Sequence, residues 1–208
     1  MTLLLTTMTA GLLTALGMAM LLVADVERRV SSNATAALVT LNAADAGLAR
    51  ALVDIRDAQA VDPMLTGAVR SGLADLTRKP LLPAGGSIDL DQATADLQSE
   101  TNAANDLGAN TPRWQLFAWG PLTAMAAPGA LPSSTYIAAW IADDGDETDG
   151  DPRADRNGRV WVHAEAYTGG GMRRAVEATV ERLAAGSARL IAWREVRSEE
   201  HTSELQSR

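Results

Sequence analysis

The chain has 208 residues with 18 basic and 26 acidic side chains, so its net charge at pH 7 is −8. This acidic balance argues against a nucleic-acid-binding surface, which needs clustered lysine and arginine. The absence of cysteine excludes disulfide bonds and thiol chemistry. Because His163 and His201 are the sole histidines, Ser–His and metal–His catalysis have almost nothing to build on, and we expect no enzymatic activity.

Residues 1–60 are predicted to form one helix, first membrane-spanning and then amphipathic. The 22 residues from Leu3 to Ala24 carry no charge, and a helix of that length is about 33 Å long, enough to cross a bilayer core. The run is longer than the apolar region of a signal peptide, and no Lys or Arg precedes it. A membrane anchor is therefore favoured over a cleaved signal, and we expect a basic leader to precede Met1 in the gene.

The second half of this helix carries an apolar stripe with alternating spacings of four and three residues. Its members are Val30, Ala34, Ala37, Leu41, Ala44, Leu48, Ala51 and Ile55. Such a spacing places them on one helix face. We expect Val30, Leu41, Leu48 and Ile55 to be buried against a sheet.

Residues 61–112 are predicted to be a helical and loop connection. A short helix is expected from Met64 to Leu76, followed by a loop rich in proline and glycine at residues 80–86. Asp89 or Asp91 is expected to cap a second helix that runs to about Leu107.

Residues 113–196 change to the period of a strand. Five strands are expected within residues 113–122, 134–143, 158–167, 173–183 and 188–196. The first places Trp114, Leu116 and Ala118 on one side, and the second is apolar on both sides, as in a covered strand. Turn signals such as Asn157-Gly158 separate the strands, which predicts an antiparallel meander. The fold class is therefore α+β, with the amphipathic helix covering the sheet.

A long apolar helix that continues onto an antiparallel sheet resembles a type IV pilin. Two segments are similar to the PilX-type pilus assembly proteins, a minor-pilin-like family: "ADVERRVSSNATAALVTLNAADAGLARAL" from Ala24, and "DPRADRNGRVWVHAEAYTGGGMRRAVEATVER" from Asp151. The resemblance implies a structural component of a type IV pilus. It implies a protein anchored in the bacterial inner membrane, with an extracytoplasmic domain, and held by its helix either in the pilus fibre or in the priming complex of the fibre. Its partners would be other pilins and pilus assembly proteins.

Two other functions fit the same sequence plan. A membrane-anchored extracytoplasmic sensory or ligand-binding domain would use the stripe as a dimeric coiled coil. A secreted enzyme behind a signal peptide is disfavoured because no nucleophile–base pair is visible.

The segment from Asp143 to Val160 is dense in acidic side chains and glycines. Calcium takes 6–8 oxygen ligands, and closely spaced carboxylates can supply them. The candidate Ca²⁺ ligands are Asp144, Asp146, Asp149, Asp151, Asp155 and Asn157. The spacing does not match an EF-hand loop, and the alternative is a solvated acidic turn neutralised by Arg153, Arg156 and Arg159.

His163 lies among alternating strand residues and is expected to be a surface or half-buried histidine rather than a catalytic residue.

The final segment 197–208, "RSEEHTSELQSR", has no helical or strand period. It resembles a translated sequencing adapter, so we expect it to be a non-native tail without tertiary contacts.

Overall fold

The computed structural model describes residues 2–75, 77–82, 85–104, 110–125, 133–168, 171–184 and 186–196. The predicted tail at 197–208 lies outside these residues. The elements are α1 (Thr2–Asp57), α2 (Asp62–Leu65), α3 (Leu90–Ala103), β1 (Gln115–Pro121), a 3-10 turn (Leu122–Met125), β2 (Tyr136–Asp143), β3 (Arg159–Tyr167), β4 (Arg173–Ala184) and β5 (Ser187–Val196). The chain forms two compact units, and the boundary falls within α1 between Val39 and Thr40.

The first unit is the part of α1 up to Val39, which begins with the uncharged run. This is the one described helix that is long and apolar enough to cross a membrane, and none of its most apolar stretch is buried. The hydroxyls of its threonines donate hydrogen bonds to backbone carbonyls of the preceding helical turn: Thr9 to Leu5 and Thr14 to Ala10, each at 2.8 Å. Hydroxyls bonded back to the helix in this way present little unsatisfied polarity to an apolar medium.

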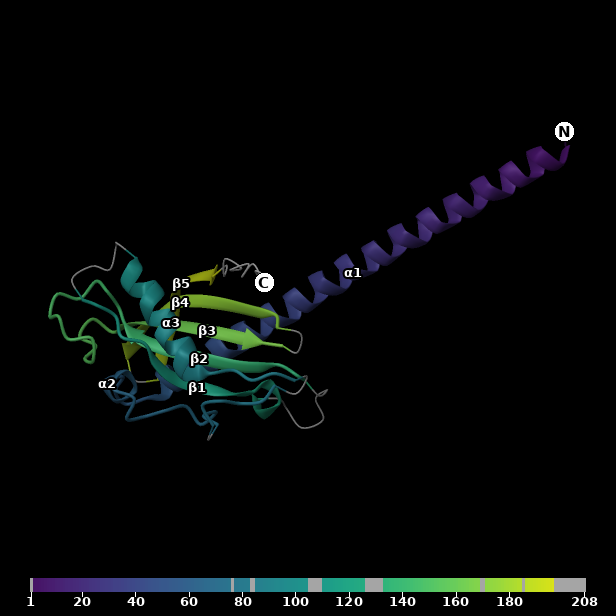
Figure 1. Ribbon diagram of the computed structural model, residues 1–208. Helices are drawn as coiled ribbons and strands as arrows, with labels where there is room; N and C mark the ends of the chain where they lie inside the picture. The colour runs from purple at the N-terminus through teal and green to yellow at the C-terminus, as the bar shows by residue number, and fades with distance from the viewer. Residues whose placement is uncertain are drawn as a thin grey trace, which may run out of the picture. The chain divides into compact units, whose positions relative to one another are not determined.

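The second unit is built on a five-stranded antiparallel sheet in the order β1-β2-β3-β4-β5, which confirms the predicted meander and the α+β class (Figure 1). All eight residues of β2 are buried, as its two apolar sides predicted. The turn before β3 uses Gly158 at φ +78°, where an added Cβ would lie 2.9 Å from the Arg182 carbonyl oxygen. Only glycine tolerates that position without a backbone shift.

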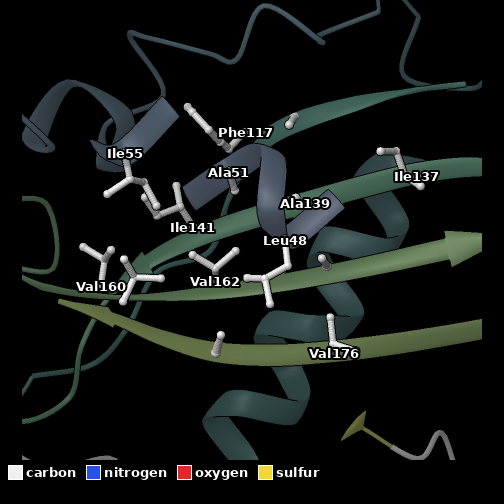
Figure 2. Close-up of a cluster of buried hydrophobic side chains, with 14 of the residues drawn as sticks. Leu48, Ala51, Ile55, Phe117, Ile137, Ala139, Ile141, Val160, Val162 and Val176 are labelled. Atoms are coloured by element: carbon white, nitrogen blue, oxygen red, sulfur yellow. The ribbon is translucent and has the colours of Figure 1, made fainter. Parts of the chain in front are cut away.

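The amphipathic half of α1 packs on one face of the sheet. Figure 2 shows Leu48, Ala51 and Ile55 pointing into the apolar side chains of the strands. Small residues let the helix approach closely: a Cβ added to Gly47 would lie 3.6 Å from the Ala164 Cβ. Strand β5 is also bonded to this helix, because Trp193 Nε1 donates to Asp45 Oδ1 at 2.9 Å.

The predicted burial of the stripe holds for only part of its length. Leu48 and Ile55 are buried and Leu41 is partly buried, but Val30 is 62% exposed, so its predicted burial is wrong. Burial on α1 begins at Thr40. The nine residues of β3 span about 30 Å, which matches about 20 helical residues at 1.5 Å each. The sheet is therefore too short to cover the stripe as far as Val30.

The predicted second helix, α3, covers part of the other face of the sheet, a placement that the sequence did not indicate. Asp89 caps α3 by accepting hydrogen bonds from the backbone N–H groups of Asp91 and Gln92, as predicted. Two tryptophans bond to this helix. Trp140 of β2 donates from Nε1 to Thr94 Oγ1, and Trp114, which directly precedes β1, donates from Nε1 to Thr101 Oγ1, each at 2.7 Å. The sheet is thus sandwiched between α1 and α3.

Three local predictions differ from the structure. The register of β1 shifts between Leu116 and Ala118, so Ala118 joins the core under α1 while Leu116 joins the cluster under α3. The helix expected from Met64 is only the four-residue α2, because the backbone N–H groups of Ser71 and Asp75 donate to carbonyls of β1. The α3 helix ends at Ala103 rather than near Leu107, a residue outside the described part of the chain.

Candidate functional site

The candidate site lies where β2 passes into the acidic loop that leads to β3. Residues Ile137, Ala139 and Ile141 of β2 face α1. Because side chains alternate along a strand, Asp143 falls on the same inward face and is fully buried. The alternation of side chains along β2 therefore places the Asp143 carboxylate in the protein interior.

Three carboxylates converge at this point, and we refer to Asp143, Asp144 and Glu147 as the carboxylate cluster. One oxygen from each lies within 4.8 Å of the others, and all three residues are buried. Asn110, which precedes β1 and is 1% exposed, donates from Nδ2 to Asp143 Oδ2 at 2.6 Å. The cluster therefore joins a segment more than thirty residues away in the chain.

The loop supports the cluster with hydrogen bonds from its backbone and from the Asn157 side chain. Glu147 Oε1 accepts from the backbone N–H groups of Arg156 and Asn157, both at 2.6 Å. Asp144 Oδ1 accepts from Asn157 Nδ2 at 2.9 Å. Asp155 accepts from the Gly158 N–H at 2.7 Å, and its own N–H donates to Asp62 Oδ1 at 3.2 Å. These bonds hold the carboxylates of Asp144, Glu147 and Asp155 in place.

Other oxygens of the same side chains receive no hydrogen bond. Among the described residues, no group donates to Asn110 Oδ1, Asp143 Oδ1 or Glu147 Oε2, although all three atoms are buried. Buried polar atoms are nearly always partnered in folded proteins, so three such oxygens in one place call for an explanation.

The six predicted ligands divide into three groups. Asp144 belongs to the carboxylate cluster, whereas Asp155 and Asn157 serve the loop through the hydrogen bonds above. Asp146, Asp149 and Asp151 are exposed. Sequence reasoning missed Asp143, Glu147 and Asn110 as members of the site. The alternation of β2 could have identified Asp143, but no local signal identifies Asn110.

Burial and mutual repulsion dominate the electrostatics of the cluster. Burial, followed by the negative charges of Glu147 and Asp155, raises the pKa of Asp143 to about 7. Burial also raises the pKa of Asp144 and of Asp155. Keeping these groups ionised together in the folded chain is therefore unfavourable unless positive charge is supplied.

In the absence of metal, the free energy of unfolding is expected to fall as the pH rises from about 4 to about 7. The pKa of Asp143 is raised from 3.8 to about 7, so within that window the folded chain binds a proton that the unfolded chain has lost. Stability then falls by up to about 1.4 kcal/mol per pH unit. Thermal melts in chelator at pH 5 to 8 should show a shallower pH dependence for Asp143→Asn than for the wild type. Equal pH dependence in the two proteins would contradict this prediction.

A second group of ionisable side chains lies on the opposite face of the sheet, and we call His163, Glu165, Arg173 and Glu177 the buried ion network. His163 is 1% exposed, so the expected surface or half-buried position is wrong. Its Nε2 lies 2.9 Å from Glu165 Oε1 and its Nδ1 lies 3.0 Å from Glu177 Oε1. The rings of Trp114 and Trp140, both bonded to α3, lie beside its imidazole with centroids at 5.9 and 5.8 Å. The strand pattern does not reveal this covering.

The geometry of the buried ion network favours a charged histidine. Burial by itself would lower the pKa of His163, but hydrogen bonds to Glu165 and Glu177 outweigh that effect and raise it. Burial likewise opposes ionisation of Glu165, yet His163 and Arg173 lower its pKa overall. Every ionised member has an opposite charge beside it, so the network is a structural element of this face.

No protein-family model, no curated protein and no solved structure matches this chain. The apolar helix, the doubly covered sheet and the carboxylate cluster are thus the features from which its function is inferred.

Proposed function

We propose that this protein is a minor-pilin-like structural component of a type IV pilus, held in the bacterial inner membrane by α1 and carrying an extracytoplasmic β domain. The observation that carries the proposal is a single helix that is uncharged and exposed from Leu3 to Ala24 and then packs on an antiparallel sheet from Thr40 onward. The proposed protein acts by assembly and not by catalysis.

The exposed half of α1 has the composition of a helix that packs against other helices. Gly11, Ala15 and Ala19 recur every four residues and so lie along one face. Small residues at that spacing allow close backbone approach and van der Waals packing in place of lipid contact. The proposed partners are therefore other pilins and pilus assembly proteins, bound through this helix.

The anchoring step predicts that a charge in the apolar run prevents membrane integration. An arginine at the centre of a membrane helix costs about 2.5–3.5 kcal/mol on the insertion scale. We expect the wild type to resist alkaline extraction from membranes and Leu13→Arg to be extracted or degraded. Leu38→Arg is the matched control, because both leucines are about equally exposed on the same helix, at 61% and 62%. Loss of integration in both variants would contradict the prediction.

The assembly step is tested separately from anchoring. Because the chain has no cysteine, Ala15→Cys introduces a unique thiol on the small-residue face. In a bacterium that assembles type IV pili, it should crosslink to a pilin carrying a cysteine in its own helix, and the product should appear in sheared fibres or in the assembly complex. A membrane-anchored chain that crosslinks to no pilin would refute the pilus proposal and leave the anchor standing.

The alternative of a membrane-anchored ligand-binding domain has one observation in its favour. A hollow of about 610 Å³ lies beside α3, with Trp114 and Trp161 among its apolar residues and Glu177 and Arg194 among its charged ones. Its proposed dimeric coiled coil does not fit, because Ala44, Leu48, Ala51 and Ile55 of the stripe are buried in the chain's own core. The structural proposal is therefore preferred.

A further inference from the structure

We propose that Asp143, Asp144, Glu147 and Asn110 hold one divalent cation, with Ca²⁺ as the favoured ion. This inference is independent of the pilus proposal. It differs from the site expected from the sequence, because the exposed Asp146, Asp149 and Asp151 are not ligands in it.

The unpartnered oxygens carry the inference. Asp143, Asn110 and Glu147 are 0%, 1% and 5% exposed, and each has one buried oxygen without a hydrogen-bond donor among the described residues. The amide of Asn110 lies against Asp143, so its oxygen belongs to the same place as the carboxylates. A bound cation would satisfy all three oxygens together, as no single protein donor does.

The charge of the cluster points to the same ion. Arg156 lies 3.9 Å from Asp149, and Arg159 lies 3.3 Å from Glu181. Within the described part of the chain, no arginine or lysine pairs with a carboxylate of the cluster. Arg156 therefore pairs with an exposed carboxylate of the loop and Arg159 pairs with β4, although the charge of Arg159 still acts on Asp144 from a distance. Among the described residues, the three converging carboxylates have no ion-pair partner.

The donor set selects a hard cation. The four side chains offer oxygen atoms only, which suits Ca²⁺ or Mg²⁺ rather than zinc or copper. Calcium accepts an irregular shell of 6–8 oxygens at about 2.3–2.6 Å, and water can supply those that the protein does not. Glu147 uses Oε1 for two backbone N–H groups and has Oε2 left for the ion. A site assembled from a loop and a distant asparagine fits the more adaptable shell of calcium.

Cation binding would fasten three segments to one another. Asn110 precedes β1, Asp143 ends β2, and Glu147 lies in the loop before β3. The loop is also bonded to the start of α2 through Asp155 and Asp62. We therefore expect occupancy to stabilise this end of the sheet, where the long helix ends.

The test uses the full chain in detergent, melted at pH 8 in millimolar Ca²⁺ and in EGTA. A cation at 100-fold excess over its Kd should raise Tm by about 5–10 °C for a chain of this size. Glu147→Gln keeps an oxygen that can accept from the backbone N–H groups of Arg156 and Asn157, but it removes the negative charge of the cation ligand. This variant should therefore lose most of the calcium-induced rise in Tm. Asp143→Asn should lose the shift as well, and it should melt above the wild type in EGTA because it removes a buried repelling charge.

Asp151→Asn is the matched control, because it removes one exposed charge from the same loop and should keep the full calcium shift. Equilibrium dialysis with radioactive calcium should find one tightly held ion per wild-type chain and none in Asp143→Asn. A larger shift with Mg²⁺ than with Ca²⁺ would reassign the ion. If the wild-type Tm is the same in Ca²⁺, Mg²⁺ and EGTA at pH 8 while acidification raises it, a proton neutralises the cluster and the proposal is overturned.

Discussion

Replacing Glu165 with glutamine is expected to destabilise the folded chain by about 3–5 kcal/mol, the usual cost of removing one partner from a buried ion pair. Glu165 is 1% exposed and lies 2.9 Å from His163 Nε2. Arg173 and the Tyr167 hydroxyl also bond to this carboxylate. The variant leaves the buried imidazolium facing an amide at Nε2, with Glu177 as its one remaining carboxylate, and it also removes the carboxylate that pairs with Arg173. These two lost charge interactions are the source of the loss.

Urea unfolding of the full chain in detergent measures this effect, with Glu195→Gln as the matched control. Glu195 pairs with Arg174 at 3.4 Å, and both side chains are about one-third exposed. Its loss should therefore cost no more than about 1 kcal/mol. A Glu165→Gln cost as small as that of the control would show that the buried ion network contributes no net stability.

The same network has a defined pH window. The pKa of His163 is raised from 6.5, so its contribution is complete below pH 6.5 and is lost as the pH rises through its folded value. The pKa of Glu165 is lowered from 4.5, so its contribution is present above pH 4.5 and is lost in acid. The difference between wild type and Glu165→Gln should therefore be largest near pH 5.5.

Truncating Leu48 to alanine is expected to cost about 2–5 kcal/mol, the range for buried leucines. Leu48 is 5% exposed and points from α1 into the side chains of the strands (Figure 2). Its neighbours in the core are close-packed side chains such as Val162 and Ile141, which leave little freedom to fill the cavity. The loss therefore includes both the transfer of the removed atoms and the cavity left behind.

Leu38→Ala is the control for this experiment, because it makes the same change on the same helix at a residue that is 62% exposed. Leucine and alanine have similar helix propensities, so a change below about 0.5 kcal/mol is expected. Urea unfolding of both variants measures the difference. If Leu48→Ala behaves like the control, α1 does not cover the sheet in solution.

Local patterns in the sequence were sufficient for the individual elements. The uncharged run predicted the helix, and Asn157-Gly158 predicted the turn before β3. All five strands were predicted, most clearly by period-two alternation in β1, β3 and β4 and by a run that is apolar on both sides in β2. Asp89 was one of two predicted caps of α3, and the structure places it there. These features depend on neighbours within a few residues, which is why they can be read from a single sequence.

The tertiary structure decided which faces are covered and for what length. Burial on α1 starts at Thr40 because the strands are short, and Val30 therefore lies beyond the covered part. His163 is buried beside Trp114 and Trp140, which bond to α3 on that side of the sheet. The irregularity between Leu116 and Ala118 reassigns Ala118 to the core under α1. Periodicity defines the faces of an element but carries no information about the partner that covers each face.

The candidate site shows the same division most clearly. The sequence by itself determined that the β2–β3 connection is acidic and glycine-rich, and it supplied Asp144. The other three members of the site depend on the folded chain. Asp143 lies on the inward face of β2, and Glu147 is buried. Asn110 contacts Asp143 although the two residues are 33 positions apart in the sequence. Every carboxylate in that loop is alike in the sequence. Distance and burial, which arise only when the segments pack together, separate those that can hold a cation from those that remain in solvent.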